Sequence, residues 1–265
     1  MTFAVLTHHK CASNWLIRYC KTVADLNGLS IGATHRSNEG FSENLDIVVV
    51  INALHGFARQ QNWTGIHVIR NPLDLVASAY FSHRDTHGVG GWGTMTLQRD
   101  LLRSVCKAEG MMMTIAVLER ADFDKRVVGP LLAMREWDYD DATIATLRME
   151  DAVIDADSTL GAALKARFGS NLQLPPAADF MFEAFSNGRR PGEIDEASHY
   201  RCGQPGAWRE DLPEAAVKYV QLHMRQILER FYPDSLSDSP GLAAPRSIRG
   251  EPRREEAALK ARSAP

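Results

Sequence analysis

Apolar runs of two kinds alternate along the first eighty residues. Short runs with few polar interruptions cover residues 3–7, 29–34, 45–52 and 65–70. Continuous, β-branched runs such as 45–52 are typical of strands buried on both faces, as in a parallel sheet. Residues 13–27 instead repeat apolar side chains at helical spacing, and a second helix is expected to begin at Pro72. The order strand, helix, strand, strand, helix predicts an α/β fold with a central parallel β-sheet flanked by helices.

Helix-end signals and later patterns complete the expected organisation. Ser13 or Asn14 is expected to cap the first helix and Gly28 to end it. The remaining elements are a mainly helical region at 88–140 that starts with a glycine-rich loop, a strand at 142–150, a helix at 158–169 and a long amphipathic helix at 214–232. The composition then changes to Pro, Gly, Ser, Ala and charge. This predicts a domain over 1–234 and a flexible or disordered tail over 235–265, with a helical turn or two near 254–262.

Composition narrows the class of protein. The chain has 265 residues, of which 45% are hydrophobic, and a net charge of −3, which predicts one large core and no general attraction to nucleic acid or membrane surfaces. No apolar run is long enough for a membrane span, and the N-terminal one is too short for a secretory signal. Four scattered cysteines without CxxC spacing indicate free thiols, not disulfides or a zinc site. We therefore expect a cytoplasmic protein without a bound metal.

The first strand and first helix are joined by a polar segment, residues 7–14, which we call the first turn. A helix N-terminus offers free backbone N–H groups and the positive end of the helix dipole, and both favour a phosphate-like anion. Lys10 would add a full positive charge. The residues after it are small or polar: Cys11, Ala12, Ser13 and Asn14. Because the GxxxxGK[ST] phosphate loop is absent, a capped helix beside a solvated lysine remains the alternative.

A second segment repeats this arrangement over residues 70–78, "RNPLDLVAS", which we call the second turn. An arginine at the carboxyl end of a strand points into the crevice where α/β folds bind ligands. Arg70 could clamp a phosphate bidentately, and Ser78 could complete the cage from the following helix. Asp74 would repel an anion, so we expect it to fix the loop or pair with a basic side chain. The alternative is an Arg70–Asp74 pair that only holds the turn.

Together the two turns resemble motifs of the sulfotransferase family. Its first motif, T-Y-P-K-S-G-T-T-W, is similar to "THHKCASNW" through Thr7, Lys10 and Trp15. Its second, R-x-P-x-D-x-x-x-S, matches the second turn at every fixed position. Segments 145–169 and 200–212 resemble two later family segments in the same order. The resemblance covers roughly residues 3–232 and implies a P-loop-NTPase-like, three-layer fold.

The resemblance also implies a cofactor and its ligands. The family transfers a sulfuryl group from 3′-phosphoadenosine-5′-phosphosulfate (PAPS) without a metal. The implied ligands are Lys10, Cys11, Ala12, Ser13 and Asn14 for the 5′-phosphosulfate; Arg70, Ser78, Arg201, Cys202 and Gly203 for the 3′-phosphate; and Trp15 and Phe182 near the adenine. Without the resemblance, the two aromatic residues would be interpreted as core packing.

Four substitutions depart from the family pattern. His9, Ala12, Met149 and Ala207 stand where the family has proline, glycine, tyrosine and aspartate. They keep open a second hypothesis, a PAP- or PAPS-binding protein without catalysis. A third is an ATP-dependent kinase on a related fold, which the absence of GK[ST] and of a convincing magnesium carboxylate disfavours.

The implied reaction is in-line transfer to a hydroxyl or amine acceptor, with Lys10 neutralising the oxygen that leaves. A base must take the acceptor's proton. The resemblance nominates His55, the alternative being a loop histidine that bonds to backbone. His8, His9, His35 and His83 are in reserve, and some branches of the family use a glutamate. The acceptor pocket is expected from residues 87–93, 111–113 and 188–200. The sequence leaves the acceptor open among small alcohols, phenols, amines, glycans and lipids, and leaves the oligomeric state open.

Overall fold

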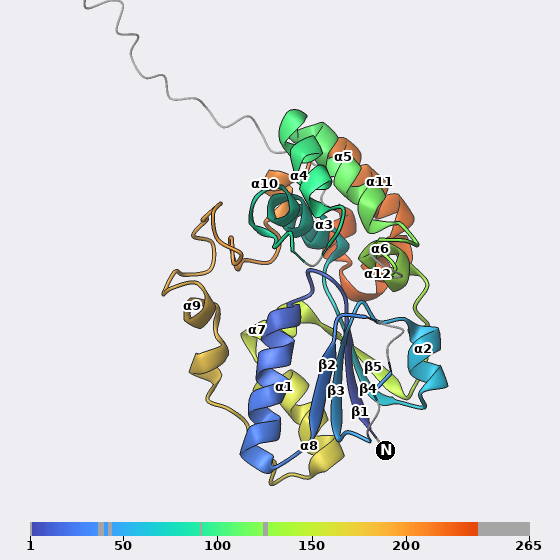
Figure 1. The fold of residues 1–265 in the computed structure, drawn as a ribbon, viewed down its shortest axis with the longest axis vertical. Helices are drawn as coiled ribbons and strands as arrows, with labels where there is room; N and C mark the ends of the chain where they lie inside the picture. Colours follow the sequence, from blue (N-terminus) through green and yellow to red (C-terminus); the bar gives the residue numbers. More distant parts are fainter. Residues whose placement is uncertain (1, 37–39, 42–43, 91, 124–126, 238–265) are drawn as a thin grey trace, which may run out of the picture.

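The computed structural model describes residues 2–36, 40–41, 44–90, 92–123 and 127–237 (Figure 1). Its centre is a sheet of five parallel strands in the order β2-β3-β1-β4-β5. The strands are β1 (Phe3–Thr7), β2 (Ile31–Thr34), β3 (Ile47–Ile51), β4 (Thr64–Ile69) and β5 (Ile144–Arg148). The predicted α/β class and the parallel sheet are thus confirmed.

Thirteen α-helices are present within the described residues. They are α1 (Ser13–Asn27), α2 (His55–Gln60), α3 (Pro72–Phe81), α4 (Met95–Ser104), α5 (Lys107–Leu118), α6 (Pro130–Arg135), α7 (Met149–Ile154), α8 (Ala162–Phe168), α9 (Phe182–Phe185), α10 (Trp208–Asp211), α11 (Glu214–His223), α12 (Arg225–Phe231) and α13 (Asp234–Ser237). Two π-helical turns, Ser82–Thr86 and Asp157–Gly161, and a 3₁₀ turn, Ala177–Phe180, complete the assignment.

Successive side chains along each strand point to opposite faces of the sheet, so each face has its own part of the core. Val5 and Val49 pack with side chains of α1 and α8 on one face, while Leu6 and Val48 pack with residues of α2 and with Trp63 and Trp137 on the other. A third cluster joins α3, α5, α11 and α12. In Figure 1 this helical group lies beyond the carboxyl ends of the strands, so it covers the edge where ligands bind in such folds.

The sequence predicts the C-terminal end of α1 correctly and its N-terminal cap wrongly. Gly28 ends the helix in the left-handed conformation (φ 64°), as predicted. The expected cap by Ser13 or Asn14 is wrong. Ala12 occupies the cap position at φ 57° with no side-chain cap bond, and the Ser13 hydroxyl donates to the carbonyl of His8 at 3.2 Å. The first amides of α1 are therefore not satisfied by a cap.

The C-terminal region differs from the expected pattern in two places. The single helix over 214–232 is in fact two, α11 and α12, which meet at Met224. The first residues of the expected tail belong to α13, where Ser235 is buried and its hydroxyl accepts a hydrogen bond from Asn71 Nδ2 at 2.8 Å. The rest of the tail, with the helical turn expected near 254–262, lies outside the described residues. In the described part of the chain, every helix is too short or too polar to cross a membrane.

Candidate functional site

The two turns start side by side because their strands are neighbours. β1 pairs with β4 so that Thr7 lies opposite Val68, and the first and second turns follow a few residues later. β1 is followed along the chain by β2 and β3 on one side of it, whereas β4 leads to β5 on the other. Both turns thus lie at the point where strand order reverses, which is where open α/β sheets bind ligands.

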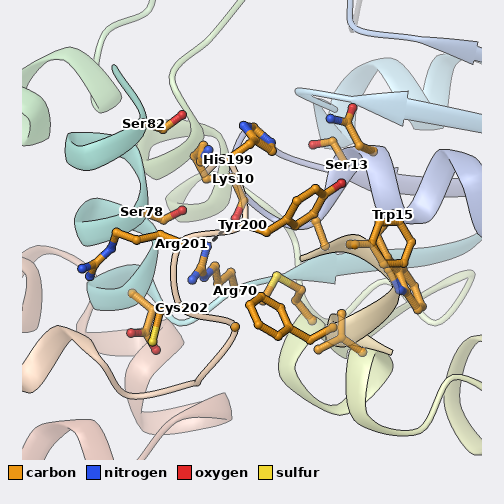
Figure 2. Close-up of a pocket in the computed structure, with 18 of the residues that line it drawn as sticks. Lys10, Ser13, Trp15, Arg70, Ser78, Ser82, His199, Tyr200, Arg201 and Cys202 are labelled. Carbon is orange, nitrogen blue, oxygen red and sulfur yellow. Dashed lines mark hydrogen bonds between the residues drawn. The ribbon is translucent and has the colours of Figure 1, made fainter. Parts of the chain in front are cut away.

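Residues of both turns line one cavity of about 350 Å³. This volume is in the range of small-molecule sites. Figure 2 shows Lys10 and Arg70 between α3, which carries Ser78 and leads directly to Ser82, and α1, which carries Trp15. The predicted site residues that line the cavity are Lys10, Ala12, Ser13, Asn14, Trp15, Arg70, Ser78, Phe182, Arg201, Cys202 and Gly203. Cys11 and His55 are the two that do not line it.

The first turn is held in an unusual backbone conformation. Lys10 (φ 67°) and Ala12 (φ 57°) are both left-handed, which costs free energy for residues other than glycine and persists only where the surroundings enforce it. Two hydrogen bonds enforce it here: Cys11 N–H donates to His8 O at 3.1 Å, and Arg70 Nη1 donates to Lys10 O at 3.0 Å. The Cys11 side chain is buried in the core, so this residue can offer only its backbone.

The surroundings of Lys10 disfavour its charged form. Burial, with a smaller contribution from the positive charge of Arg70, lowers the pKa of Lys10 from 10.5 to about 7. An anion in the cavity would restore the full charge of the ammonium group. The site is therefore prepared for a negatively charged ligand.

Arg70 in the second turn and Ser82 beyond it present donors that have no partner among the described residues. Arg70 Nε and Ser82 Oγ are buried, and no described residue is hydrogen-bonded to either atom. Ser78 and Ser82 are four residues apart, so they share one face of the helical segment, and both line the cavity. Sequence reasoning missed Ser82, although the spacing that links Asp74 to Ser78 also leads to it. Buried polar atoms without partners indicate a ligand that completes them.

Asp74 fixes the loop, as expected. Its carboxylate is 3% exposed and accepts hydrogen bonds from Gly206 N–H at 2.7 Å and Trp208 N–H at 3.1 Å. This ties α3 to the segment that carries Arg201 and Gly203. Among the described ion pairs there is none between Asp74 and Arg70.

We expect Asp74→Ala to lower the free energy of unfolding by about 3 kcal/mol, because two buried N–H groups lose their acceptor. Urea denaturation would measure it, with Asp100→Ala on the exposed face of α4 as the control. Equal midpoints for the two variants would contradict this role of Asp74.

Glu150, on α7 directly after β5, supports the second turn. Its carboxylate accepts from Asn71 N–H and from the Tyr232 hydroxyl, both at 2.9 Å, and burial raises its pKa. Met149, which stands where the family has tyrosine, lines the cavity. Helix α7 therefore supports the second turn through Glu150 and lines the cavity through Met149.

Comparison with solved structures supports this fold. No family model matches the chain, and no curated protein matches it. The structure of mouse sulfotransferase SULT7A1 complexed with PAP is similar, with 12% identity, 89% of each chain covered and a TM-score of 0.58. A retinol dehydratase in complex with androsterone and the inactive cofactor PAP shares 15% identity over 78% of this chain and 57% of its own, with a TM-score of 0.41.

This chain has the sulfotransferase fold. The resemblance of the motifs therefore extends to the fold around them, across most of the chain.

In this sulfotransferase fold, Arg201 forms ion pairs with two acidic side chains. Its guanidinium pairs with Asp211 and, at 3.1 Å, with Glu196, and it lies 3.8 Å from the ring centre of Phe81. A phosphate that binds Arg201 must therefore compete with two carboxylates. Figure 2 shows Arg201 beside α3, near Ser78.

The aromatic residues form the other end of the cavity. A β-carbon on Gly203 (φ 67°) would lie 2.3 Å from the Phe182 ring, so this ring rests directly on the Gly203 backbone. The Trp15 indole donates to Phe180 O at 2.8 Å and stacks on Tyr19 at 5.3 Å between centroids. Trp15 thus belongs to the core and to the cavity wall at once.

His55 is placed away from the cavity. It begins α2, its Nε2 lies 2.9 Å from Asp141 Oδ2, and its ring packs on Trp137. The structure brings it to neither turn. It is a helical histidine bonded to a carboxylate, not the loop histidine bonded to backbone that the alternative expected.

Other histidines do reach the cavity. His9, His35, His87 and His199 line it, whereas His8 and His83 are buried behind it. His87 and His199 were not singled out from the sequence, although they fall in two of the segments expected to form the acceptor pocket. The third such segment, residues 111–113, packs into the core on α5. Among the described residues no group of three or more His, Cys, Asp or Glu could hold a metal.

Proposed function

We propose that this protein is a sulfotransferase, which binds PAPS in the cavity and moves its sulfuryl group to a hydroxyl or amine acceptor. The observation that carries the proposal is that Lys10, Arg70 and Ser78 line one cavity at two adjacent strand ends. PAP in the similar mouse sulfotransferase supports the same cofactor here. The unpartnered Arg70 Nε and Ser82 Oγ fit a phosphate group.

Each group has a task in this reaction. PAPS supplies a sulfuryl group joined to a phosphate that can leave. Lys10 and the first amides of α1 would hold the 5′ end, where Lys10 neutralises the charge on the departing oxygen. Arg70, Ser78 and Ser82 would hold the 3′-phosphate, and Trp15 and Phe182 would enclose the adenine. Catalysis is then mainly positioning and electrostatic stabilisation, as in phosphoryl transfer.

A thermal-shift comparison followed by a turnover assay tests the proposal. PAP at 100 times its Kd should stabilise the protein by about 2.7 kcal/mol, and 5′-AMP, which lacks the 3′-phosphate, should do less at the same concentration. Labelled PAPS with a panel of alcohols, phenols and amines should then give a sulfated product. Stabilisation without any turnover would favour the non-catalytic PAP-binding protein. Stronger stabilisation by ATP with magnesium than by PAP would favour the kinase and overturn the proposal.

The lowered pKa of Lys10 predicts a proton uptake on binding. At pH 8 the free site holds Lys10 mostly neutral, since its pKa is about 7, and a bound phosphate raises that pKa again. PAP binding at pH 8 should therefore take up about one proton, and the Lys10 share should vanish below pH 6, where Lys10 is already charged. Calorimetry in Tris and HEPES, which differ in ionisation enthalpy, measures the uptake. Lys10→Met should show none, and an unchanged uptake in this variant would assign the proton elsewhere.

A further inference from the structure

The end of the cavity near Lys10 is rich in histidine. His9 adjoins Lys10, His83 and His87 lie in and after the π-helical turn Ser82–Thr86, and His199 comes from the loop before Arg201. The rings of His9, His83 and His87 have centroids 5.1–5.6 Å apart and share Trp92 as a wall. Since several rings are near Lys10, hydrogen bonding decides which of them can accept a proton.

His9 is a hydrogen-bond donor toward the cavity. With the Gln98 amide oriented as in this structure, its nitrogen lies 3.3 Å from Nδ1 of His83 and donates to it, which assigns the His83 hydrogen to Nε2. That hydrogen is donated to Nε2 of His9 at 2.8 Å. The ring of His9 is left with a hydrogen on Nδ1 and no free lone pair. His9 therefore suits an oxygen of the sulfuryl group and cannot serve as the base.

His87 has the opposite arrangement. Its Nδ1 lies 2.8 Å from the carbonyl of Gly88, which can only accept, so Nδ1 carries the hydrogen and Nε2 carries the lone pair. No described residue is hydrogen-bonded to that Nε2. The backbone is also fixed, since His87 N–H donates to Ser82 O at 2.6 Å and its carbonyl accepts from Arg99. His87 thus presents an oriented ring with one free acceptor nitrogen.

The remaining cavity histidines lack such an anchor. Neither ring nitrogen of His35 or His199 is hydrogen-bonded to any described residue, so neither ring has a fixed tautomer. A general base needs a fixed orientation toward the proton that it takes. Of the histidines that line the cavity, only His87 combines a fixed tautomer with a free lone pair.

We propose that His87 is the general base of the reaction, an inference that rests on the proposed function. Its Nε2 takes the proton of the acceptor hydroxyl as the acceptor oxygen forms a bond to sulfur. The bond from sulfur to the 5′-phosphate oxygen breaks, and its electron pair stays on that oxygen beside Lys10. The products are the sulfated acceptor, PAP and protonated His87, which returns its proton to solvent. Gly88 O stabilises the protonated ring through Nδ1.

The charges around His87 favour its neutral form. Burial lowers its pKa most, the Gly88 bond raises it, and Lys10 and Arg99 lower it. His9, His83 and His199 face the same space, and the pKa of each is lowered in turn by burial. A base must be deprotonated to act. At saturating PAPS, which keeps Lys10 charged, kcat/KM for the acceptor should therefore rise with pH through an apparent pKa below the ordinary histidine value of about 6.5 and then level off.

The test compares acceptors of different acidity. His87→Gln should lower kcat by about 10²-fold for weakly acidic acceptors such as 4-methoxyphenol or cyclohexanol. For 4-nitrophenol assayed at about pH 8, where it is largely ionised, the loss should be less than about tenfold, because no base is needed. The acid limb of the pH profile should disappear in this variant, and PAP should still raise its melting temperature. His55→Gln, outside the cavity, is the matched control that should keep the wild-type profile.

The outcomes separate this role from the function itself. Turnover of 4-methoxyphenol that persists in His87→Gln, or an equal loss on all acceptors, would overturn the role of His87 alone. Loss of PAP stabilisation in His87→Gln would assign the residue to cofactor binding and also overturn it. No turnover by the wild-type protein on any acceptor would overturn the proposed function, and the base assignment with it.

Discussion

Replacing Lys10 with methionine is expected to lower kcat for sulfuryl transfer by about 10²–10³-fold. The methionine keeps the length and the apolar stem of the side chain but removes the charge beside the leaving oxygen. Because the site is buried enough to lower the pKa of Lys10 to about 7, solvent cannot replace the lost charge. Labelled PAPS with an acceptor that the wild-type protein uses gives the rate.

The control for this prediction is Lys21→Met, an exposed lysine on α1 that lies outside the cavity. It should transfer at the wild-type rate. Lys10→Met should remain folded, because it removes a charge that its surroundings disfavour and keeps the Arg70 hydrogen bond, which goes to the Lys10 backbone carbonyl. Transfer by Lys10→Met within a few-fold of wild type would remove Lys10 from the mechanism.

The sheet and both turns could be predicted from sequence because their signals are local. Residues 47–51 are continuous β-branched positions, and Pro72 and Gly28 mark helix ends through their own backbone preferences. Parallel pairing then brings the carboxyl ends of β1 and β4 together whatever the details of the loops. The placement of Lys10 and Arg70 in one cavity follows from these few signals.

Other features have no local signal. Ala12 adopts a left-handed conformation that its residue type disfavours, and it does so because Arg70 and His8 hold the first turn from outside. The break at Met224 carries neither glycine nor proline. These features are decided by contacts between segments that are far apart in the chain, and propensity cannot reveal them.

The positions of the histidines in the fold also have no local signal in the sequence. His55 follows β3 in sequence and looks well placed, yet helix α2 holds it against Asp141. His87 reaches the cavity because α3 continues into a π-helical turn, which re-aims the chain toward Lys10. Such π-helical turns are frequent at functional sites, but no residue pattern in "SHRDT" marks one. The proposed base therefore depends on hydrogen bonds that no local pattern in the sequence reveals.

Replacing Arg70 with methionine is expected to weaken PAP binding by about 10²-fold while leaving 5′-AMP binding within a few-fold of wild type. The guanidinium has a buried Nε without a partner among the described residues, and we assign that donor to the 3′-phosphate. Only PAP carries this phosphate, so only PAP should lose the charge-assisted hydrogen bonds. Calorimetric Kd values for both nucleotides measure the difference, and Ser78→Ala should show a smaller loss in the same direction.

The 5′-AMP measurement also separates recognition from damage to the fold. Arg70 donates to the Lys10 carbonyl, so its loss could loosen the first turn, and that effect would weaken both nucleotides alike. Arg70→Lys sharpens the comparison, since it keeps the charge but cannot form the bidentate contact. Arg225→Met, on the exposed surface of α12, is the control for a lost surface charge. Equal losses for PAP and 5′-AMP would make Arg70 a support of the first turn and leave the 3′-phosphate without its principal ligand.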